Sequence, residues 1–535
     1  MRYLKLLIVL VMMTFLTGCN TEEDIKTDYE ILMEAASTLK METVYTESFE
    51  FVKELKYEDK IINVSWTSSK VEAISNFGVV KQGYENQQVT LTATFTYNAE
   101  KLINKYNVTV PALTAEQRFN IALKEIAFDE LIEADIKLNT KFYDEDIIAT
   151  WTSSHPDIIS NEGKYNAPSE NTEVVLTVTL ELGSEKMEKD YYVRTKPNPK
   201  EVEVDHHLVL DDAVNFDPNF MENCHIEDKY LVLNEGANEG TYVSNIFSVA
   251  EFKSVVGSWG ALSSKDATVE LEIRCLVDNK WSMYLSYGEW GLGLENKPMK
   301  SGTNDSLVKL STDEIVIMSS KSGVALQYRV TLRRTSEMVD SPKLELVALA
   351  IEYKKYSYPV DTTNLPTSVT NDVPMLRQGI VPEIGGSICS PTSATMLLKY
   401  KGLSFADKDE YEHRYIAYLA RDYGNEIFGN WVYNTVTISA YGIRSYTMRM
   451  YSLEELQYHL ANVGPVALSV KGKMVAYDKD KSYTTGGHLL VATGYYIDNG
   501  KVIFKCNDPA VSEVYVEYAY ETIEDVWRMV AYIVE

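Results

Sequence analysis

The sequence contains one cysteine in a setting suited to nucleophilic chemistry. Cys389 follows a glycine-containing loop that begins at Gly385, and an apolar run ending at Gly402 predicts a helix directly after it. Pro391 suits the first turn of that helix, because proline lacks the N–H that would be unpaired there. A thiol at a helix start faces unpaired N–H groups and the positive end of the helix dipole, which lower its pKa. The alternative is a buried cysteine that acts as a small hydrophobic residue.

A thiolate nucleophile needs a nearby base and a group that orients that base. His488 follows two glycines and begins an apolar strand, and a return strand leads to Asp508. We expect a three-residue loop at residues 498–500, which pairs Ile497 with Lys501. That register places His488 diagonally opposite Asp508, within reach of a hydrogen bond. A two-residue turn would instead put these two side chains on opposite faces of the hairpin.

Four motifs, in this order, resemble the family-39 cysteine peptidases, the bacteriocin-processing and double-glycine-peptidase-like branch of the papain superfamily. They are Cys-Ser-Pro-Thr-Ser-x-x-Met-Leu-Leu-x-Tyr-x-Gly from Cys389, Gly-Pro-Val-Ala-Leu-Ser-Val from Gly464, Gly-His-Leu-Leu-Val-Ala-Thr-Gly-Tyr from Gly487, and Asn-Asp-Pro from Asn507. The resemblance covers residues 372–535. It implies a papain-like α+β domain with Cys389 as nucleophile, His488 as general base and Asp508 as the residue that orients the base.

The same resemblance implies that Gln378 donates a hydrogen bond to the oxyanion, with a backbone N–H at Cys389 as the second donor. Two positions depart from the family pattern, which often has glycine on both sides of the cysteine. Ile388 and Ser390 stand there instead, and we expect their side chains to crowd the thiolate or narrow the approach of a substrate. Cys506 has no counterpart in this scheme. We interpret it as a core thiol, with a redox role as the alternative.

The chain has 535 residues, a formal net charge of −27, and 45% hydrophobic and 24% charged residues. This length requires several domains, and the composition is typical of globular proteins. Phosphate binding needs basic patches, which this acidic sequence does not show, so we expect no nucleic-acid partner. No cysteine or histidine spacing is typical of a metal site, so we expect no metal and no other cofactor.

Two further groups of residues allow a binding or redox role. His206-His207 lies close to Asp211-Asp212, and we interpret this group as a solvated loop rather than a metal site. Cys224 and Cys275 share a predicted domain and could form a disulfide, although nothing in the sequence requires one.

The N-terminal segment indicates export. Residues 1–18 combine a basic start with an apolar run that is shorter than the roughly 20 residues needed to span a bilayer. The run ends in Leu-Thr-Gly-Cys, which resembles the bacterial lipobox and implies that Cys19 becomes the lipid-modified first residue of the mature protein. A tether at residues 19–29 follows. We therefore expect an extracytoplasmic protein, lipid-anchored to the bacterial cell membrane, with a plain signal peptide as the alternative.

Residues 30–196 contain two copies of one module, because residues 62–69 are matched by residues 147–154 and the match continues downstream at a constant offset. Alternating Val, Thr and Leu residues in each copy indicate antiparallel strands of a β-sandwich. The Trp-Thr-Ser-Ser pattern resembles the atypical immunoglobulin-like repeats of bacterial surface proteins. This resemblance implies repeats at residues 30–112 and 113–196, which usually act as spacers and sometimes as adhesive surfaces.

The rest of the chain divides into an all-β part and a mixed part. Residues 200–358 contain many short predicted strands, which favour a jelly-roll-like β-sandwich and resemble a module found before secreted cysteine peptidases. Residues 359–371 are a predicted linker. Residues 372–535 contain helical patterns followed by strands, which is typical of an α+β fold. The predicted fold class is therefore multidomain: two all-β immunoglobulin-like sandwiches, one further β-sandwich and a C-terminal α+β papain-like domain.

Four tryptophans in the β-rich parts allow two interpretations. Trp66 and Trp151 lie among β-branched residues of the repeats, and Trp259 and Trp290 lie in the third domain. We expect all four to be core residues. Stacking on sugars by the first pair, and binding of glycan or peptide by the second pair, are the alternatives.

Two functions follow from these features. The first is a lipid-anchored, extracytoplasmic cysteine peptidase in which Cys389 attacks a peptide carbonyl and water hydrolyses the resulting thioester. Its substrate would be a secreted protein, a peptide or the stem peptides of the cell wall, and acyl transfer to an amine would use the same groups. The second is a cell-surface binding or adhesive protein with a catalytically lapsed peptidase-like domain.

Overall fold

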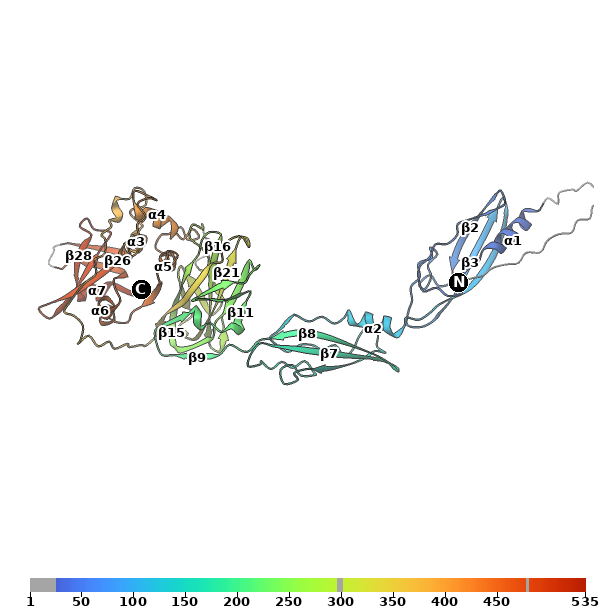
Figure 1. Ribbon diagram of the computed structural model, residues 1–535, viewed down its shortest axis with the longest axis horizontal. Helices are drawn as coiled ribbons and strands as arrows, with labels where there is room; N and C mark the ends of the chain where they lie inside the picture. Colours follow the sequence, from blue (N-terminus) through green and yellow to red (C-terminus); the bar gives the residue numbers. More distant parts are fainter. Residues whose placement is uncertain (1–25, 296–301, 478–480) are drawn as a thin grey trace, which may run out of the picture. The chain divides into compact units, whose positions relative to one another are not determined.

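The computed structural model describes residues 26–295, 302–477 and 481–535, and Figure 1 labels their helices and strands. The predicted signal segment and the predicted lipid-attachment residue Cys19 lie outside the described residues. The chain divides into two compact units, Met1–Asn166 with Glu173–Arg194 and Ala167–Thr172 with Thr195–Glu535. Within the described residues, no helix has the length and apolar character needed to cross a membrane. The expected multidomain, mostly β architecture is confirmed.

Each repeat of the first unit packs one helix against one four-stranded antiparallel sheet. The first repeat consists of α1 (Asp28–Thr38), β1 (Glu54–Tyr57), β2 (Lys60–Ser68), β3 (Gln87–Tyr97) and β4 (Glu100–Val110). The second consists of α2 (Ala115–Leu123), β5 (Leu131–Ile132), β6 (Ile148–Ser153), β7 (Thr172–Leu182) and β8 (Glu185–Thr195). Both helices begin with a capping box, formed by a threonine at the N-cap and a Glu or Gln three residues later.

The repeat tryptophans are core residues, as expected. Trp66 is 8% exposed and its indole N–H donates to the carbonyl of Val52 at 2.8 Å. Trp151 is 6% exposed and donates to the carbonyl of Asn139 at 2.9 Å. Because ring and N–H are both used inside each repeat, neither tryptophan offers a face for sugar stacking.

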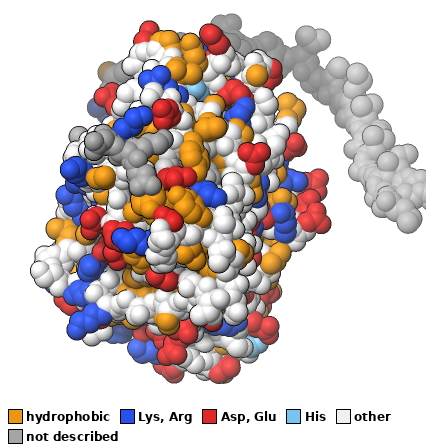
Figure 2. Space-filling model, turned by 90° about the vertical axis from the view of Figure 1, so that its left-hand side faces the viewer, with side chains coloured by type: hydrophobic (Ala, Val, Ile, Leu, Met, Phe, Trp, Pro, Cys, Tyr) orange, Lys and Arg blue, Asp and Glu red, His pale blue; other side chains and the backbone are white. Residues whose placement is uncertain are grey.

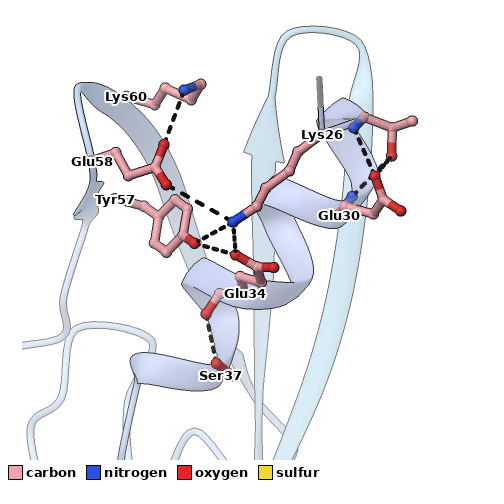
Figure 3. Close-up of polar contacts among 8 residues, drawn as sticks. Lys26, Glu30, Glu34, Ser37, Tyr57, Glu58 and Lys60 are labelled. Atoms are coloured by element: carbon pink, nitrogen blue, oxygen red, sulfur yellow. Dashed lines mark hydrogen bonds and ion pairs between the residues drawn. The ribbon is translucent and has the colours of Figure 1, made fainter. Parts of the chain in front are cut away.

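Polar contacts fix the start of the first repeat to its sheet (Figure 3). Lys26, two residues before α1, contacts the carboxylate of Glu34 and the hydroxyl of Tyr57, the latter at 3.1 Å. Glu58 contacts both Lys26 and Lys60, at 3.9 and 3.5 Å. The chain segment that enters α1 is therefore held against the β1–β2 hairpin.

The β-rich part of the second unit contains fourteen strands that, within the described residues, form one continuous sheet around an apolar core. They are β9 (Glu201–Val204), β10 (Leu208–Asp212), β11 (Met221–Glu222), β12 (Cys224–Glu227), β13 (Tyr230–Leu233), β14 (Glu239–Val243), β15 (Ile246–Leu262), β16 (Ala267–Val277), β17 (Lys280–Trp281), β18 (Leu285–Trp290), β19 (Val308–Ser311), β20 (Glu314–Ile317), β21 (Gly323–Arg334) and β22 (Lys343–Tyr353). We call this part the sandwich.

The core of the sandwich decides the predictions made for its tryptophans and cysteines. Trp259 and Trp290 are fully buried, which confirms them as packing residues. Cys224 and Cys275 are both buried in the same core and both are free thiols, so the possible disulfide between them does not form.

The C-terminal part has a sheet in the order β24-β29-β25-β26-β27-β28, to which β23 adds by pairing with β26. Its strands are β23 (Ser368–Thr370), β24 (Ser445–Arg449), β25 (Val466–Val475), β26 (Ser482–Asp498), β27 (Lys501–Asn507), β28 (Tyr515–Ala519) and β29 (Trp527–Val534). Its helices are α3 (Cys389–Tyr400), α4 (Glu412–Leu419), α5 (Trp431–Ser439), α6 (Leu453–Asn462) and α7 (Tyr520–Val526). Acidic, basic and hydrophobic side chains are interspersed on the face drawn in Figure 2.

The sandwich and the C-terminal part are joined by a shared interior. Val432, Tyr433 and Val436 of α5 belong to the apolar core of the sandwich. The hydroxyl of Tyr433 donates to the carbonyl of Tyr287. Conversely, Leu346 and Ala348 of β22 belong to the core of the C-terminal part. These two parts therefore fold as one unit, although the sequence predicts a linker between them at residues 359–371.

The interpretation of His206-His207 and Asp211-Asp212 as a solvated loop is wrong. His207 is fully buried and its Nε2 pairs with a carboxylate oxygen of Glu455 in α6 at 2.8 Å. Asp211 accepts a hydrogen bond from the hydroxyl of Tyr328 at 2.7 Å. These polar residues are stable inside the protein because each has a partner that the sequence places far away along the chain.

Candidate active site

Cys389 occupies the first position of α3. The helix begins there without a side-chain cap, since Ile388 at the N-cap offers no polar group, and it ends before Gly402, whose φ of +87° is left-handed. The predicted helix and its stop are thus confirmed. The apolar side chains of α3 are fully buried and anchor the helix in the core, namely Ala394, Met396, Leu397 and Leu398. Cys389 itself stays partly exposed at the helix end.

The electrostatic setting of Cys389 favours the thiolate. Burial raises the pKa of this thiol, but a hydrogen bond and the charge of His488, with further backbone hydrogen bonds, bring the pKa below its usual value. Burial alone would lower the pKa of His488, whereas its hydrogen bonds and charge interactions with Asp508 and Cys389 raise that pKa. Opposite shifts in two contacting groups favour a thiolate–imidazolium pair.

His488 bridges the thiol and a buried carboxylate. Its Nε2 lies 2.8 Å from Oδ1 of Asp508, which leaves Nδ1 as the ring nitrogen available to Cys389. Asp508 is fully buried. Burial raises the pKa of Asp508, but its hydrogen bond to His488 and the charge of that ring outweigh this effect, so the pKa lies below its ordinary value. An ionised Asp508 fixes both the tautomer and the orientation of the imidazole.

Two tyrosines complete the surroundings of this carboxylate. The hydroxyls of Tyr483 and Tyr518 donate to Oδ2 of Asp508 at 2.6 and 2.8 Å, and the N–H of Ala510 donates to Oδ1 at 3.0 Å. The ring of Tyr483 also stands perpendicular to that of His488, with 6.0 Å between ring centroids. We call Tyr483 and Tyr518 the tyrosine clamp.

The hairpin that carries His488 and Asp508 has the predicted pairing at these residues, but its turn length and the position of its extra residue differ from the prediction. Its turn has two residues, Asn499 and Gly500 with φ of 47° and 80°, and pairs Asp498 with Lys501. The predicted three-residue loop is therefore wrong. A β-bulge at Thr493, between the pairs Ala492–Cys506 and Gly494–Lys505, supplies the missing residue instead. Beyond the bulge Val491 pairs with Asn507, which brings the two functional side chains to the same face.

Gln378 lies between the carboxylate and the loop that precedes the cysteine. Its backbone N–H donates to the carbonyl of Pro509 at 3.0 Å, and its side-chain Nε2 donates to the carbonyl of Gly385 at 2.9 Å. The side chain is 8% exposed. An amide NH₂ has two N–H groups, so one remains for a further acceptor.

The structure does not support the expectation that the neighbours of Cys389 crowd its thiol. Ile388 is fully buried in an apolar cluster with Val381, Ala417 and Phe428. Ser390 is also fully buried, and its hydroxyl hydrogen-bonds with that of Tyr532 at 2.7 Å. Both side chains are taken up by the interior, where glycine would leave gaps.

Cys506 is a core thiol, as interpreted. It is fully buried, and burial raises its pKa well above the usual value. A thiol of this kind is a poor nucleophile. His488 contacts both Cys389 and Asp508, and Gln378 bonds to Gly385 and Pro509, whereas Cys506, two residues from Asp508, belongs to the apolar core.

The tyrosine clamp is the part of the site that the sequence did not predict. Tyr483 precedes His488 by five residues, a spacing that would put the two side chains on opposite faces of a regular strand. A second irregularity, where the β25–β26 register shifts between Val470 and Gly472, corrects this difference. Tyr518 comes from β28, which pairs with β27. Neither position carries a local signal of its role.

Comparisons with known proteins agree with this architecture. Residues 370–534 match the Peptidase C39 like family, and residues 208–351 match the Peptidase C39 N-terminal domain. Residues 55–113 and 115–198 each match the atrophied bacterial Ig domain. Among curated proteins, no significant match to the chain is found.

Two solved structures are similar to parts of the chain. One is described as a C39-like peptidase from Bacillus anthracis, with 19% identity, a TM-score of 0.24, and coverage of 31% of this chain and 98% of its own. The other is xylellain, a cysteine protease from Xylella fastidiosa, with 14% identity, a TM-score of 0.22, and coverage of 34% and 91%. Both TM-scores lie below 0.5, so the family assignment rests on the sequence match.

Proposed function

We propose, on the premise that residues 370–534 are a domain of the C39-like peptidase family, that this protein hydrolyses peptide bonds as a lipid-anchored, extracytoplasmic cysteine peptidase. The observation that carries the proposal is the hydrogen-bonded chain from Cys389 through His488 to the buried Asp508. A nucleophile, a base and an orienting group in sequence are what acyl transfer requires.

The proposed reaction begins with the proton of the Cys389 thiol on His488. The thiolate attacks the peptide carbonyl and forms a C–S bond, and the carbonyl oxygen becomes an oxyanion. The backbone N–H at the start of α3 and the remaining side-chain N–H of Gln378 are the proposed donors to this oxyanion. Loss of one such donor typically slows a reaction of this kind by about 10²–10³.

Breakdown of this intermediate uses the same groups. His488 gives its proton to the leaving amine as the peptide C–N bond breaks, which leaves a thioester on Cys389. His488 then takes a proton from water as the water attacks the thioester, and returns a proton to the sulfur when the acid product leaves. Asp508 stays ionised throughout and stabilises the imidazolium.

The test is alkylation and turnover of the full-length protein. Iodoacetamide at pH 6 should label Cys389 far faster than the buried Cys506, which serves as an internal reference. Cys389→Ala should abolish cleavage of a peptide library without lowering thermal stability. Slow labelling of Cys389, or cleavage that survives this substitution, would favour the binding or adhesive protein instead.

The proposed location has its own test. If Cys19 carries a lipid, Cys19→Ala should move the protein from the membrane fraction to the soluble fraction of the producing bacterium. A lipid gives binding that a plain cleaved signal peptide does not. Equal partition of both forms would contradict the anchor while leaving the peptidase assignment untouched.

A further inference from the structure

The segment that carries Gln378 is a small surface turn. Residues Gln378–Ile380 form one turn of 3₁₀ helix, and Arg377, Gly379 and Ile380 are exposed on its outer side. A single turn has few hydrogen bonds of its own. The place of the Gln378 side chain therefore depends on the bonds that tie this turn to neighbouring elements.

The peptide group between Arg377 and Gln378 is hydrogen-bonded on both sides. Its N–H donates to the carbonyl of Pro509, the residue after Asp508, at 3.0 Å. Its carbonyl accepts a hydrogen bond from Nε2 of His413 in α4 at 3.2 Å. A peptide group is planar and rigid, so fixing its N–H and its C=O fixes the direction in which the chain continues into Gln378.

The ring of His413 is set to donate to this carbonyl. A carbonyl oxygen only accepts, so Nε2 carries the proton of the neutral ring. The side chain is 2% exposed, and burial lowers the pKa of His413, which favours the neutral ring. Nδ1 is also buried, and no described residue forms a hydrogen bond with it. An apolar side chain would fill this space without the cost of that unpaired nitrogen, so the N–H to Arg377 is what histidine adds here.

Helix α4 attaches His413 to the helix of the nucleophile. Glu412, directly before His413, forms an ion pair with Lys399 of α3. Ala417, one turn further along α4, is buried in one apolar cluster with Ile388, the N-cap of α3. The start of α3 supplies one of the two proposed oxyanion donors. Through α4, His413 therefore connects that donor to the segment that carries the other.

We propose that His413 is a positioning residue that holds Gln378 in place as an oxyanion donor. It is buried, so it acts through Gln378 rather than on the substrate. An oxyanion is stabilised only by donors within about 2.7–3.1 Å, so a small shift of the turn weakens the bond. This proposal rests on the proposed function, since an oxyanion forms only when a carbonyl is attacked.

Variants of the full-length protein test the contact. His413→Phe keeps an aromatic ring and removes the N–H. His413→Gln places an amide N–H as many bonds from Cα as Nε2 of histidine and should restore the hydrogen bond. Arg414→Ala is the matched control, because Arg414 is the next residue of α4 and its side chain bonds to Asp409 at 2.7 Å. Thermal melting establishes that each variant is folded, and His413→Leu replaces His413→Phe if the larger ring prevents folding.

The kinetic readout treats kcat and KM separately. An oxyanion donor acts in the transition state, so His413→Phe should lower kcat by about tenfold and change KM by less than about twofold. Gln378→Ala should lower kcat by about 10²–10³, and adding His413→Phe to it should lower kcat no further. His413→Gln should recover most of the wild-type kcat, and Arg414→Ala should keep it. An equal loss with and without Gln378, or a loss that His413→Gln does not reverse, would overturn the proposal.

Hydrogen exchange separates this proposal from the proposed function, because it needs no substrate. Backbone N–H groups of residues 377–388 should exchange up to about tenfold faster in His413→Phe than in wild type, and at the wild-type rate in His413→Gln. Residues 501–507 of β27 are the internal reference and should not change. If wild type cleaves no peptide but this pattern holds, hydrolysis fails and the positioning of Gln378 by His413 stands. Equal exchange in wild type and His413→Phe would refute the positioning role, whatever the protein cleaves.

Discussion

Replacing Tyr518 by phenylalanine should move the acid side of the pH–rate profile to higher pH. The change removes one hydroxyl that donates to Oδ2 of Asp508 at 2.8 Å and keeps the buried ring. The second clamp residue, Tyr483, still donates to the same oxygen at 2.6 Å. The variant therefore weakens the stabilisation of the ionised carboxylate without removing it.

The size of the effect follows from the type of hydrogen bond. A hydrogen bond to a charged group contributes about 1.5–3 kcal/mol, and about 1.4 kcal/mol is a factor of ten. Loss of the Tyr518 hydroxyl should therefore favour the protonated form of Asp508 by about tenfold to a hundredfold at a given pH. Protonated Asp508 no longer stabilises the imidazolium of His488, so the catalytic rate should fall as the ionised fraction of Asp508 falls.

The sign follows from the direction of the pKa shift. The pKa of Asp508 lies below its ordinary value in the folded protein, so its contribution to stability is present above the unfolded pKa and is lost as pH falls through the folded pKa. Tyr518→Phe raises the folded pKa towards the unfolded one. Both the loss of activity and the loss of stability should then begin at a higher pH than in wild type.

The assay measures kcat/KM, the alkylation rate of Cys389 and the melting temperature between pH 4 and 8. Tyr515→Phe is the matched control, because Tyr515 lies on the same strand and its hydroxyl donates at 2.8 Å to Glu517, which has no part in the reaction. Coincident pH profiles for the two variants would refute the role of the clamp. A Tyr518→Phe variant that is less active at every pH by one constant factor would do so too.

Three further predictions concern the support of the site. Glu314→Ala removes the closest partner of the buried Arg449 and should lower the free energy of unfolding by about 3 kcal/mol, measured by urea unfolding. This is the lower end of the range of about 3–5 kcal/mol for a broken buried ion pair, because Glu352 remains 3.8 Å from Arg449. Gly494→Ala places a Cβ 2.1 Å from the carbonyl of Val369 and should destabilise the protein by about 1–3 kcal/mol, whereas Gly486→Ala, with open space around it, should not. Isolated residues 359–535 should aggregate or lack a cooperative melt in circular dichroism, because α5 would lose the sandwich core; a soluble, active fragment would contradict this.

The groups of the proposed reaction could be predicted because their signals are local in the sequence. A helix start after a glycine-containing loop places Cys389. The strand that carries His488 was also predicted, although it begins at Ser482 and includes the two glycines that were expected to precede it. The pairing of His488 with Asp508 was obtained for the wrong reason. The prediction put the extra residue in the turn, whereas the structure puts it in a bulge at Thr493. Any single inserted residue restores the same parity, so a sequence pattern alone does not locate it.

The tyrosine clamp could not be predicted for the same physical reason. One register shift, between Val470 and Gly472, brings Tyr483 to the face of His488, and Tyr518 reaches Asp508 only through the pairing of β27 with β28. The burial of His207 also depends on a distant partner, Glu455, which lies 248 positions further along the chain. Contacts of this kind arise from packing between elements, and local residue patterns do not predict them.

The shared interior gives the sandwich a direct part in supporting Cys389, the proposed nucleophile. Helix α5 packs against β15 of the sandwich and also against α3, the helix that begins with Cys389. Every residue from Val432 to Ser439 is buried. A helix that is buried on all sides needs a neighbour on every face. In this chain the sandwich is the neighbour of one face of α5. Displacement of the sandwich would therefore leave α5 without that contact, and the start of α3, which packs against α5, would lose support. The sandwich is therefore part of the scaffold of the proposed active site, and substitutions at its contact with α5 should alter the reactivity of Cys389 as well as stability.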